Sequence, residues 1–335
     1  MVTTNRYHLA ERPEGMPDED TFDLREVELD GPGPGEALLE LRYLSVDPYM
    51  RGRMRAGESY ADPWEVGQPL RGGAVATVVE EHGTEFDEGD LVVGNMTWAD
   101  YHIADGSDLQ RVTVGELPES TALGVLGMPG RTAYFGTREV LEPRAGDTVV
   151  VSAAAGAVGS VVGQLAKLQG ATVVGFAGSD EKCAVVEDEF GFDACINYAD
   201  TEDYGDALDE VAPAGVDGYF DNVGGPITDA VFTKLNVDAH VAICGQIALY
   251  NEEETPTGPR KLGKLIQTRA RVQGLLVGDY APRWAQATAD LREWVADGEI
   301  AYRETVTEGL ENAPDAFVGL FEGENIGKQV VKIGE

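Results

Sequence analysis

Positive charge is what this sequence most lacks. Lys and Arg together number 25 in 335 residues, against 60 Asp and Glu, which gives a formal net charge of −35 at pH 7. Nucleic acids and anionic membrane surfaces are held by Lys and Arg, and a polyanion is poorly suited to either. We therefore expect no nucleic-acid partner and no membrane partner.

Lysine is especially rare, and none precedes Lys167. The seven lysines are Lys167, Lys182, Lys234, Lys261, Lys264, Lys328 and Lys332. The acidic residues are spread along the chain and are not gathered into a tail. A dispersed carboxylate surface suits high salt, where screening acts over about 3 Å at 1 M. We expect a halophile's protein; an acidic face for a basic partner is the alternative.

Cysteine is also sparse. Cys183, Cys195 and Cys244 form no CxxC motif and no zinc-ligand cluster, and an odd, small set is typical of a reducing compartment. The first fifteen residues show no signal pattern. The longest apolar stretch, 148–166, contains three glycines and indicates strand, turn and helix instead of a membrane span. We expect a cytoplasmic protein.

The residues that are present suffice for two domains. Hydrophobic residues make up 43% of the chain. From about 20 to 115, short alternating runs broken by Gly, Pro and Asp predict a β-rich, barrel-like domain. From about 126 to 300, strand-like runs alternate with helical patterns, which predicts an α/β fold with a doubly wound parallel sheet.

Individual elements can be placed within this alternation. A helix is predicted over 282–297, ended by Gly298, and another from Pro314 to Phe321. The predicted buried strands are DTVVVSA, ATVVGFA, ACINYA, GVDGYFD, HVAICG, VQGLLV and, near the end, QVVKI.

The sharpest motif lies in the segment 152–170. Ala154, Gly156 and Gly159 occupy the three positions of a GxGxxG-type fingerprint, between a strand and an apolar helix. Gly156 allows a pyrophosphate to approach the backbone, and Gly159 allows the helix to pack on its strand. The motif predicts dinucleotide binding; a plain tight turn is the alternative.

The choice between NAD and NADP depends on the end of the next strand. Gly178 and Ser179 stand there in place of the acid that would bind a free ribose 2′-hydroxyl. Lys182 follows within one turn and suits a 2′-phosphate, with Tyr198 expected nearby. Asp180 and Glu181 oppose this interpretation unless they point to water. The pattern favours NADP.

Seven segments together resemble one family. They are SVDPYMRGRM (45–54), GMPGRTAYFG (127–136), AAAGAVGSVVGQLAKLQG (153–170), GSDEK (178–182), YFDNVGG (219–225), AICGQIALYN (242–251) and GENIGKQVVK (323–332). The chain resembles the zinc-independent medium-chain dehydrogenases/reductases. Within them it resembles the leukotriene/prostaglandin reductases and curcumin reductases, which are NADPH-dependent alkenal/one oxidoreductases.

The resemblance implies an architecture. A GroES-like, β-barrel-type catalytic domain is expected over 1–125 and again over 301–335, with a Rossmann NADP-binding domain inserted over 126–300. The active site is then expected in the cleft between the domains. A homodimer through the edge strand near VQGLLV is also implied.

The resemblance further implies that no metal takes part. Independently, no cysteine precedes Cys183, and His8, His82 and His102 are scattered, so three ligands for a catalytic zinc are hard to assemble. This argues against zinc-dependent alcohol oxidation.

The implied reaction moves a hydride from NADPH to the β-carbon of an enone or enal, while charge develops on the carbonyl oxygen. Tyr250, after the fifth strand, is the expected catalytic donor to that oxygen. Tyr49 and Tyr60 are expected to line the substrate pocket. The alternatives are an interface aromatic at Tyr250 and plain packing at Tyr60.

The resemblance also implies a set of cofactor contacts. For Asn325, which is in this set, a plain turn residue is the alternative. The set is Gly156, Ala157, Val158, Gly159, Lys182, Tyr198, Asn222, Cys244, Gly245, Gln246, Ile247, Ala248, Leu249, Tyr250 and Asn325.

Arg131 departs from the family, which usually has an apolar residue there. We expect it to be exposed at a helix start; a position that selects anionic substrates is the alternative. For the whole chain the rival functions are an NADPH-dependent quinone reductase, a non-catalytic NADPH-binding protein and a zinc alcohol dehydrogenase.

Overall fold

The computed structural model describes residues 1–57, 59–254 and 256–334. These residues form two compact units. The first is Met1–Leu123, Glu304–Asn325 and Gln329–Glu335, and the second is Gly124–Arg303 and Ile326–Lys328. Over the described ranges, no helix is long and apolar enough to cross a membrane.

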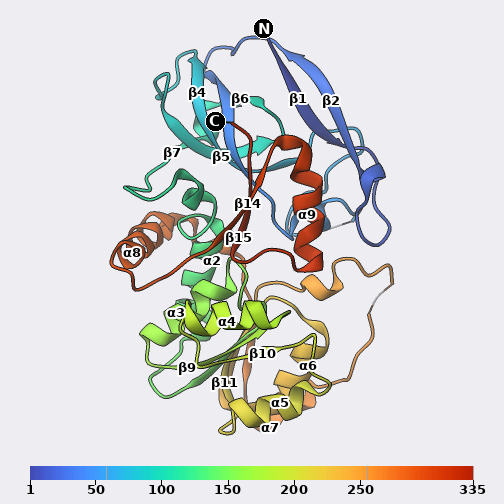
Figure 1. Ribbon diagram of the computed structural model, residues 1–335, viewed down its shortest axis with the longest axis vertical. Coiled ribbons are helices and arrows are strands. Elements are labelled where there is room, and N and C mark those ends of the chain that lie inside the picture. The colour runs from blue at the N-terminus through green and yellow to red at the C-terminus, as the bar shows by residue number, and fades with distance from the viewer. Residues whose placement is uncertain (58, 255, 335) are drawn as a thin grey trace. The chain divides into compact units, whose positions relative to one another are not determined.

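The first unit is built on antiparallel pairings (Figure 1). Its strands are β1 (Val2–Leu9), β2 (Phe22–Leu29), β3 (Glu36–Ser45), β4 (Arg71–Glu81), β5 (Leu91–Thr97), β6 (Tyr101–Asp105), β7 (Gln110–Arg111), β14 (Glu304–Glu308) and β15 (Lys328–Lys332). The main sheet has the order β14-β15-β3-β4-β5-β7, with β6 beside β3, and β1 pairs with β2. A separate β-sheet domain is confirmed, and its closure into a barrel stays a prediction.

Helices of the first unit are few and short, apart from one near the C-terminus. They are η1 (Glu19–Thr21), α1 (Met50–Arg53), η2 (Gly106–Asp108), η3 (Glu119–Leu123), η7 (Leu310–Asn312) and α9 (Ala313–Glu322). The core contains an aromatic cluster, in which Trp98 stacks on Phe22 with ring centroids 6.3 Å apart and meets the edge of Phe317 at 6.1 Å. Because Phe317 lies on α9, the C-terminal segment completes a core begun by N-terminal strands.

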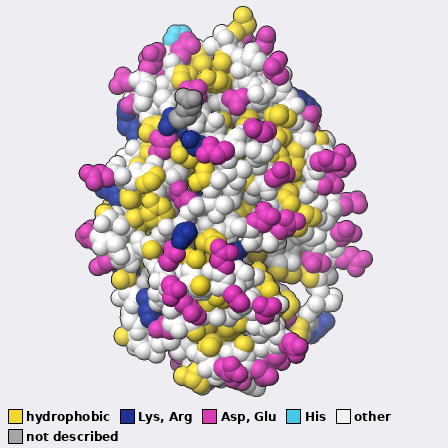
Figure 2. All heavy atoms as spheres, viewed as in Figure 1, with side chains coloured by type: hydrophobic (Ala, Val, Ile, Leu, Met, Phe, Trp, Pro, Cys, Tyr) yellow, Lys and Arg dark blue, Asp and Glu magenta, His cyan; other side chains and the backbone are white. Residues whose placement is uncertain are grey.

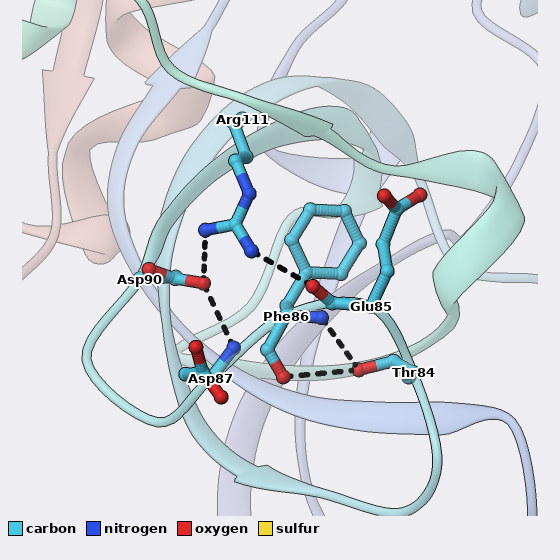
Figure 3. Close-up of polar contacts among 6 residues, drawn as sticks. All are labelled: Thr84, Glu85, Phe86, Asp87, Asp90 and Arg111. Carbon is cyan, nitrogen blue, oxygen red and sulfur yellow. Dashed lines mark hydrogen bonds and ion pairs between the residues drawn. The ribbon is translucent and has the colours of Figure 1, made fainter.

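The turn between β4 and β5 is held by polar contacts (Figure 3). Arg111 pairs with Asp90, donates to the Glu85 carbonyl at 2.7 Å, and lies 5.2 Å from the Phe86 ring centroid. The Asp87 N–H donates to Asp90 Oδ2 at 2.8 Å, and the hydrogen bonds of Asp87 and Arg111 lower the pKa of Asp90. These contacts tie β7 to the turn.

The second unit contains a parallel sheet. Its strands are β8 (Thr148–Val151), β9 (Thr172–Ala177), β10 (Ala194–Asn197), β11 (Val216–Asp221), β12 (Leu235–Ile243) and β13 (Arg271–Gly274). In the part of the chain described, the order is β10-β9-β8-β11-β12-β13 and every pairing is parallel. This is the 3-2-1-4-5-6 order of doubly wound sheets, which confirms the predicted fold class. All four residues of β8 are buried, as a central parallel strand requires.

Helical segments precede, separate and follow these strands. They are α2 (Met128–Phe135), the π-helical segment η4 (Gly136–Leu141), α3 (Gly159–Leu168), α4 (Asp180–Asp188), α5 (Tyr204–Val211), α6 (Gly225–Lys234), η5 (Ile247–Leu249), α7 (Gly263–Thr268), η6 (Val277–Arg283) and α8 (Trp284–Ala296). The helix predicted over 282–297 is α8, which buries Leu291; Gly298 follows it with a positive φ of 74°. The helix predicted from Pro314 is α9.

Arg131 differs from the expected exposed position. Its side chain is half-buried, with Nε donating to Thr288 Oγ1 at 2.9 Å and Cζ 5.1 Å from the Trp284 ring centroid. Burial lowers the pKa of Arg131. The guanidinium therefore fastens α2 to α8, a contact that a helix-start pattern cannot reveal because its partners lie over 150 residues away.

Candidate functional site

The predicted dinucleotide loop links β8 to α3. Gly159 is the first residue of α3, and a Cβ there would lie 2.3 Å from Ala153 O, so only glycine fits. A Cβ on Gly156 would meet only Ala153 of the same loop among the described residues, with Ala153 O at 3.2 Å. Gly159 thus allows close packing, and Gly156 leaves the outer face of the loop open.

The loop also contains strained backbone. Ala153 has a φ of +50°, a left-handed conformation that an alanine rarely adopts. Sequence reasoning placed the turn residue of the fingerprint at Ala154, one position later. The chain therefore makes its tight turn at Ala153, without the glycine that usually relieves the cost.

A short returning segment pairs with this loop. The Gly327 N–H donates to Ala155 O at 2.7 Å, and Gly327 forms a parallel bridge with Gly156. Gly327 has a φ of +70°, and a Cβ there would lie 1.9 Å from Arg303 O. Asn325, a predicted cofactor contact, is half-buried and stands two residues before Gly327.

The residues predicted to select NADP lie at the ends of β9 and β10. Lys182 is on the first turn of α4, which begins with Ser179 Oγ accepting the Lys182 N–H at 3.2 Å. A Cβ on Gly178 would lie 2.6 Å from Tyr198 Oη, so the tyrosine hydroxyl packs directly on the glycine backbone. Burial lowers the pKa of Lys182 and raises that of Tyr198. Lys182 and Tyr198 thus follow the ends of two neighbouring parallel strands, β9 and β10, and Tyr198 packs on Gly178.

Asn222 ties two strand ends together. Its Nδ2 donates to the carbonyl of Ser152 at 2.8 Å, and its backbone N–H donates to Ser152 Oγ at 2.9 Å. Ser152 follows β8 and Asn222 follows β11, so these contacts join the dinucleotide loop to the neighbouring loop.

Asp221 is the residue that the sequence analysis missed. It is fully buried at the end of β11, and its carboxylate accepts hydrogen bonds from six donors within the described residues. They are Ser152 Oγ, Tyr219 Oη, Val223 N, Gly224 N, Thr228 Oγ1 and Gln246 Nε2, at 2.7–3.3 Å. An Asp inside an apolar strand, directly before Asn-Val-Gly-Gly, was the available signal, because a buried carboxylate needs such donors.

The segment 244–250 is anchored to the same place. The N–H groups of Cys244 and Gly245 both donate to Asp221 O, at 2.8 and 3.0 Å. The Ile247 N–H donates to the Asn222 carbonyl at 3.3 Å, and the Ala248 N–H donates to the Val223 carbonyl at 3.1 Å. The predicted cofactor residues Gly245, Gln246, Leu249 and Tyr250 are all half-buried beside this backbone pairing. The structure therefore brings together the loops after β8, β11 and β12.

Tyr250 ends η5. Its Oη accepts the Gln246 N–H at 3.2 Å, so its own proton is directed elsewhere. Burial raises the pKa of Tyr250, which keeps the hydroxyl neutral and able to donate. The geometry provides a hydrogen-bond donor at the carboxyl edge of the parallel sheet.

Cys244 and the histidines of the first unit are held by burial and by protein contacts. Burial raises the pKa of Cys244 to about 12, so the thiol is not an activated nucleophile. His102 is buried beside Thr97 Oγ1, at 3.1 Å, while His8 and His82 contact backbone carbonyls. Across 1–57, 59–254 and 256–334, no three His, Cys, Asp or Glu side chains form a group that could hold a metal ion.

The two predicted pocket tyrosines are in the first unit. Tyr49 precedes α1 and is half-buried against the first unit's core, and burial raises its pKa. The negative charge of Asp47 raises the pKa of Tyr49 further, and Tyr60 and Arg53 lie near enough to influence it electrostatically. The side chain of Tyr60 is 66% exposed.

Comparison with known proteins matches both parts of the chain. Residues 5–112 match the family described as the N-terminal domain of oxidoreductase, and residues 157–293 match the family described as zinc-binding dehydrogenase. The NADPH-dependent curcumin reductase of Escherichia coli is 44% identical over 98% of this chain and 96% of that protein. The NADP(+)-dependent 2-alkenal reductase of Nicotiana tabacum is 43% identical over 95% and 94%.

A solved structure is similarly close. The crystal structure of CurA in complex with NADPH from Vibrio vulnificus has 44% identity and a TM-score of 0.94, covering 99% of each chain. The resemblance in sequence motifs is thereby confirmed at full length and in three dimensions. The chain belongs to the family of NADP-dependent oxidoreductases that contains curcumin reductase and 2-alkenal reductase.

Proposed function

We propose that this protein catalyses the NADPH-dependent reduction of the C=C bond of α,β-unsaturated ketones and aldehydes. The observation that carries the proposal is Tyr250: a neutral hydroxyl, oriented by the Gln246 N–H, beside the strand-end loops of a dinucleotide-binding sheet. The full-length similarity to curcumin reductase and 2-alkenal reductase supports it.

The residues present fit a phosphorylated dinucleotide. The open face of Gly156 suits a pyrophosphate, and Lys182 with Tyr198 at Gly178 suits a 2′-phosphate. The residues that would hold the cofactor are Gly156, Ala157, Val158, Gly159, Lys182, Tyr198, Asn222, the segment 244–250 and Asn325.

Each protein group then has a defined task. NADPH, when bound, would supply a hydride for the β-carbon of the substrate, and the α-carbon would take a proton from solvent. Tyr250 donates a hydrogen bond to the carbonyl oxygen, where negative charge develops, and so lowers the barrier. Asp221 and Asn222 hold the loops in register, which limits reorganisation during the reaction. Tyr49 and Tyr60 are the proposed substrate-binding residues of the first unit.

The experiment is a product analysis with labelled cofactor. Purified protein in molar KCl is mixed with a 2-alkenal, an enone or a quinone, and with NADPH deuterated at the transferable position. We expect saturated carbonyl products with deuterium at the β-carbon. Faster turnover of quinones without saturated product would favour a quinone reductase, and tight NADPH binding without turnover of any substrate would favour a non-catalytic protein.

We also propose a homodimer through the edge of the parallel sheet. Strand β13 ends the sheet, all four of its residues are exposed, and Val272 and Leu276 are 39% and 40% exposed. An exposed, partly apolar edge strand is a template for pairing with a second copy. Light scattering should give twice the chain mass, and Val272→Lys should give monomers.

We propose further that the acidic surface is an adaptation to high salt. Carboxylates are scattered over the face seen in Figure 2, where Lys and Arg are few. At low salt the carboxylates that give the net charge of −35 repel one another, and dissolved salt screens this repulsion. The melting temperature should rise from low to molar KCl; no dependence on salt would contradict the adaptation.

A further inference from the structure

Two of the three cysteines are in direct contact. Cys183, on the first turn of α4, and Cys195, in β10, have their sulfur atoms 2.6 Å apart, while Cys244 lies in the loop after β12. Both are free thiols, the first buried and the second half-buried. The twelve-residue spacing contains no CxxC motif, so only the packing of helix on strand brings them together.

Other contacts hold the same helix and strand together. Asn197 Nδ2 donates to Asp180 Oδ1 at 2.8 Å, and the Cys195 N–H donates to Glu187 Oε1 at 2.7 Å. Asp180 and Glu187 belong to α4, whereas Asn197 and Cys195 belong to β10. The sulfur contact is therefore one of several contacts along this helix–strand pair and does not depend on one flexible side chain.

From this geometry we propose that Cys183 and Cys195 are an oxidisable dithiol, which closes into an intramolecular disulfide when the protein meets a peroxide. One thiolate attacks a peroxide oxygen, the O–O bond breaks, and a sulfenic acid forms with release of hydroxide. The second sulfur then attacks the first, the S–O bond breaks, and water leaves. Two thiols and one hydrogen peroxide thus give one disulfide and two waters.

The site of the bond gives it a structural consequence. Closure fastens the first turn of α4, which carries Lys182, to β10, which is followed by Tyr198. Because the sulfurs already touch, the helix scarcely needs to move. The disulfide should therefore act as a brace that leaves the proposed 2′-phosphate contact in place, a consequence that rests on the proposed function of Lys182.

The reaction should be slow at neutral pH. Burial raises the pKa of both thiols, and the nearby carboxylate of Glu187 adds to the effect on both. The thiolate is the reactive form, so oxidation is best followed at alkaline pH. The same protection limits reaction of either thiol with electrophiles in its reduced state.

The experiment uses the complete protein with dilute hydrogen peroxide at alkaline pH. We expect the intact mass to fall by two hydrogens and the thiol count after denaturation to fall from three to one. Digestion with a glutamate-specific protease cuts after Glu187 and Glu189, between the two cysteines, so the peptides stay joined only through the disulfide. Dithiothreitol should restore three thiols.

Single variants assign the bond. Cys244→Ser should still lose two hydrogens, whereas Cys183→Ser and Cys195→Ser should lose none and gain oxygen instead. Oxygen addition without loss of hydrogens in the unaltered protein, or a disulfide between two chains, would overturn the proposal. The peptide map of the unaltered protein decides the question even if a variant fails to fold.

Activity provides a separate readout. The oxidised protein should keep its KM for NADPH and melt at a higher temperature than the reduced protein. A confirmed disulfide together with a raised KM for NADPH would refute the proposal that the disulfide leaves the Lys182 contact in place. It would not refute the proposal that Cys183 and Cys195 form a disulfide. Absence of enone reduction in both states would refute the proposed function and leave the mass result intact.

Discussion

Gln246 Nε2 donates a hydrogen bond to Asp221 Oδ2 at 3.0 Å, so the last residue of β11 holds the first turn after β12. The same carboxylate reaches Ser152 at the start of the dinucleotide loop. One buried side chain thereby connects the three loops that carry most of the proposed cofactor contacts, although it faces no solvent itself.

Asp221→Asn should disorder this connection. Asparagine would replace one carboxylate oxygen, which now accepts from two or more donors, with an amide nitrogen that cannot accept. Each hydrogen bond to a charged group lost in this way is worth about 1.5–3 kcal/mol. We expect a lower melting temperature and a KM for NADPH raised about tenfold or more, with a smaller fall in kcat. Kinetics measured well below the melting temperature check this.

A matched control lies on the same strand. Asp217, near the other end of β11, accepts from the Thr148 N–H and from Asn236. Asp217→Asn should destabilise the sheet without changing KM for NADPH. Equal changes in KM for both variants would mean that Asp221 acts only through general stability.

Lys182→Ala should separate the two nicotinamide cofactors. Loss of a charge-assisted hydrogen bond to the 2′-phosphate should weaken NADPH binding by about 1.5–3 kcal/mol and leave NADH binding nearly unchanged. Calorimetric titration with each cofactor measures the difference. Lys167→Ala, on α3 and paired with Asp193, is the control. Equal losses for both cofactors would refute the phosphate contact.

Tyr250→Phe should slow the chemical step. Removing one donor to the developing oxyanion should lower kcat on enones by roughly 10²-fold, with a nearly normal KM for NADPH. Because burial raises the pKa of Tyr250, the unaltered enzyme should show no loss of this donor below about pH 10. Tyr101→Phe, a surface phenol bonded to Glu40, should have no effect. An unchanged kcat would remove Tyr250 from the reaction.

Gly159→Ala should disrupt the dinucleotide loop. The added Cβ would lie 2.3 Å from Ala153 O, and backbone cannot yield as a flexible side chain can. We expect a loss of about 2–4 kcal/mol in the free energy of unfolding, together with weaker NADPH binding. Gly263→Ala, with open space around the new Cβ, is the control for urea denaturation. Equal stability of the two variants would contradict the close packing.

His102 should make stability depend on pH. Burial lowers its folded pKa to about 4, whereas the unfolded value is about 6.5. As pH falls, the unfolded state therefore binds the proton before the folded state does. The contribution of neutral His102 to the free energy of unfolding is complete above pH 6.5. It is lost as pH falls towards 4, and the loss amounts to at most about 3 kcal/mol. His102→Asn should flatten this part of the curve relative to the exposed control His82→Asn. Parallel curves for the two variants would count against the shift.

Local pattern alone was enough for most of the secondary structure and for the family. Alternation of apolar strands with amphipathic helices predicted the doubly wound sheet, because both periodicities are written into neighbouring residues. Gly156 and Gly159 were found for the same reason: a strand, a tight turn and a helix start lie within a dozen residues. The positions proposed for NADP recognition, Lys182 and Tyr198, also follow two successive strands.

What only the tertiary structure decided are the contacts between residues far apart in the chain. Strand order places Ser152, Asp221 and Gln246 together, and it pairs Gly327 with the loop at Ala155, although no local signal links them. Helix-on-strand packing brings Cys183 to Cys195, and helix-on-helix packing brings Arg131 to Trp284. Such contacts depend on how whole elements stack, and periodicity records only which face of an element is buried, not what it is buried against.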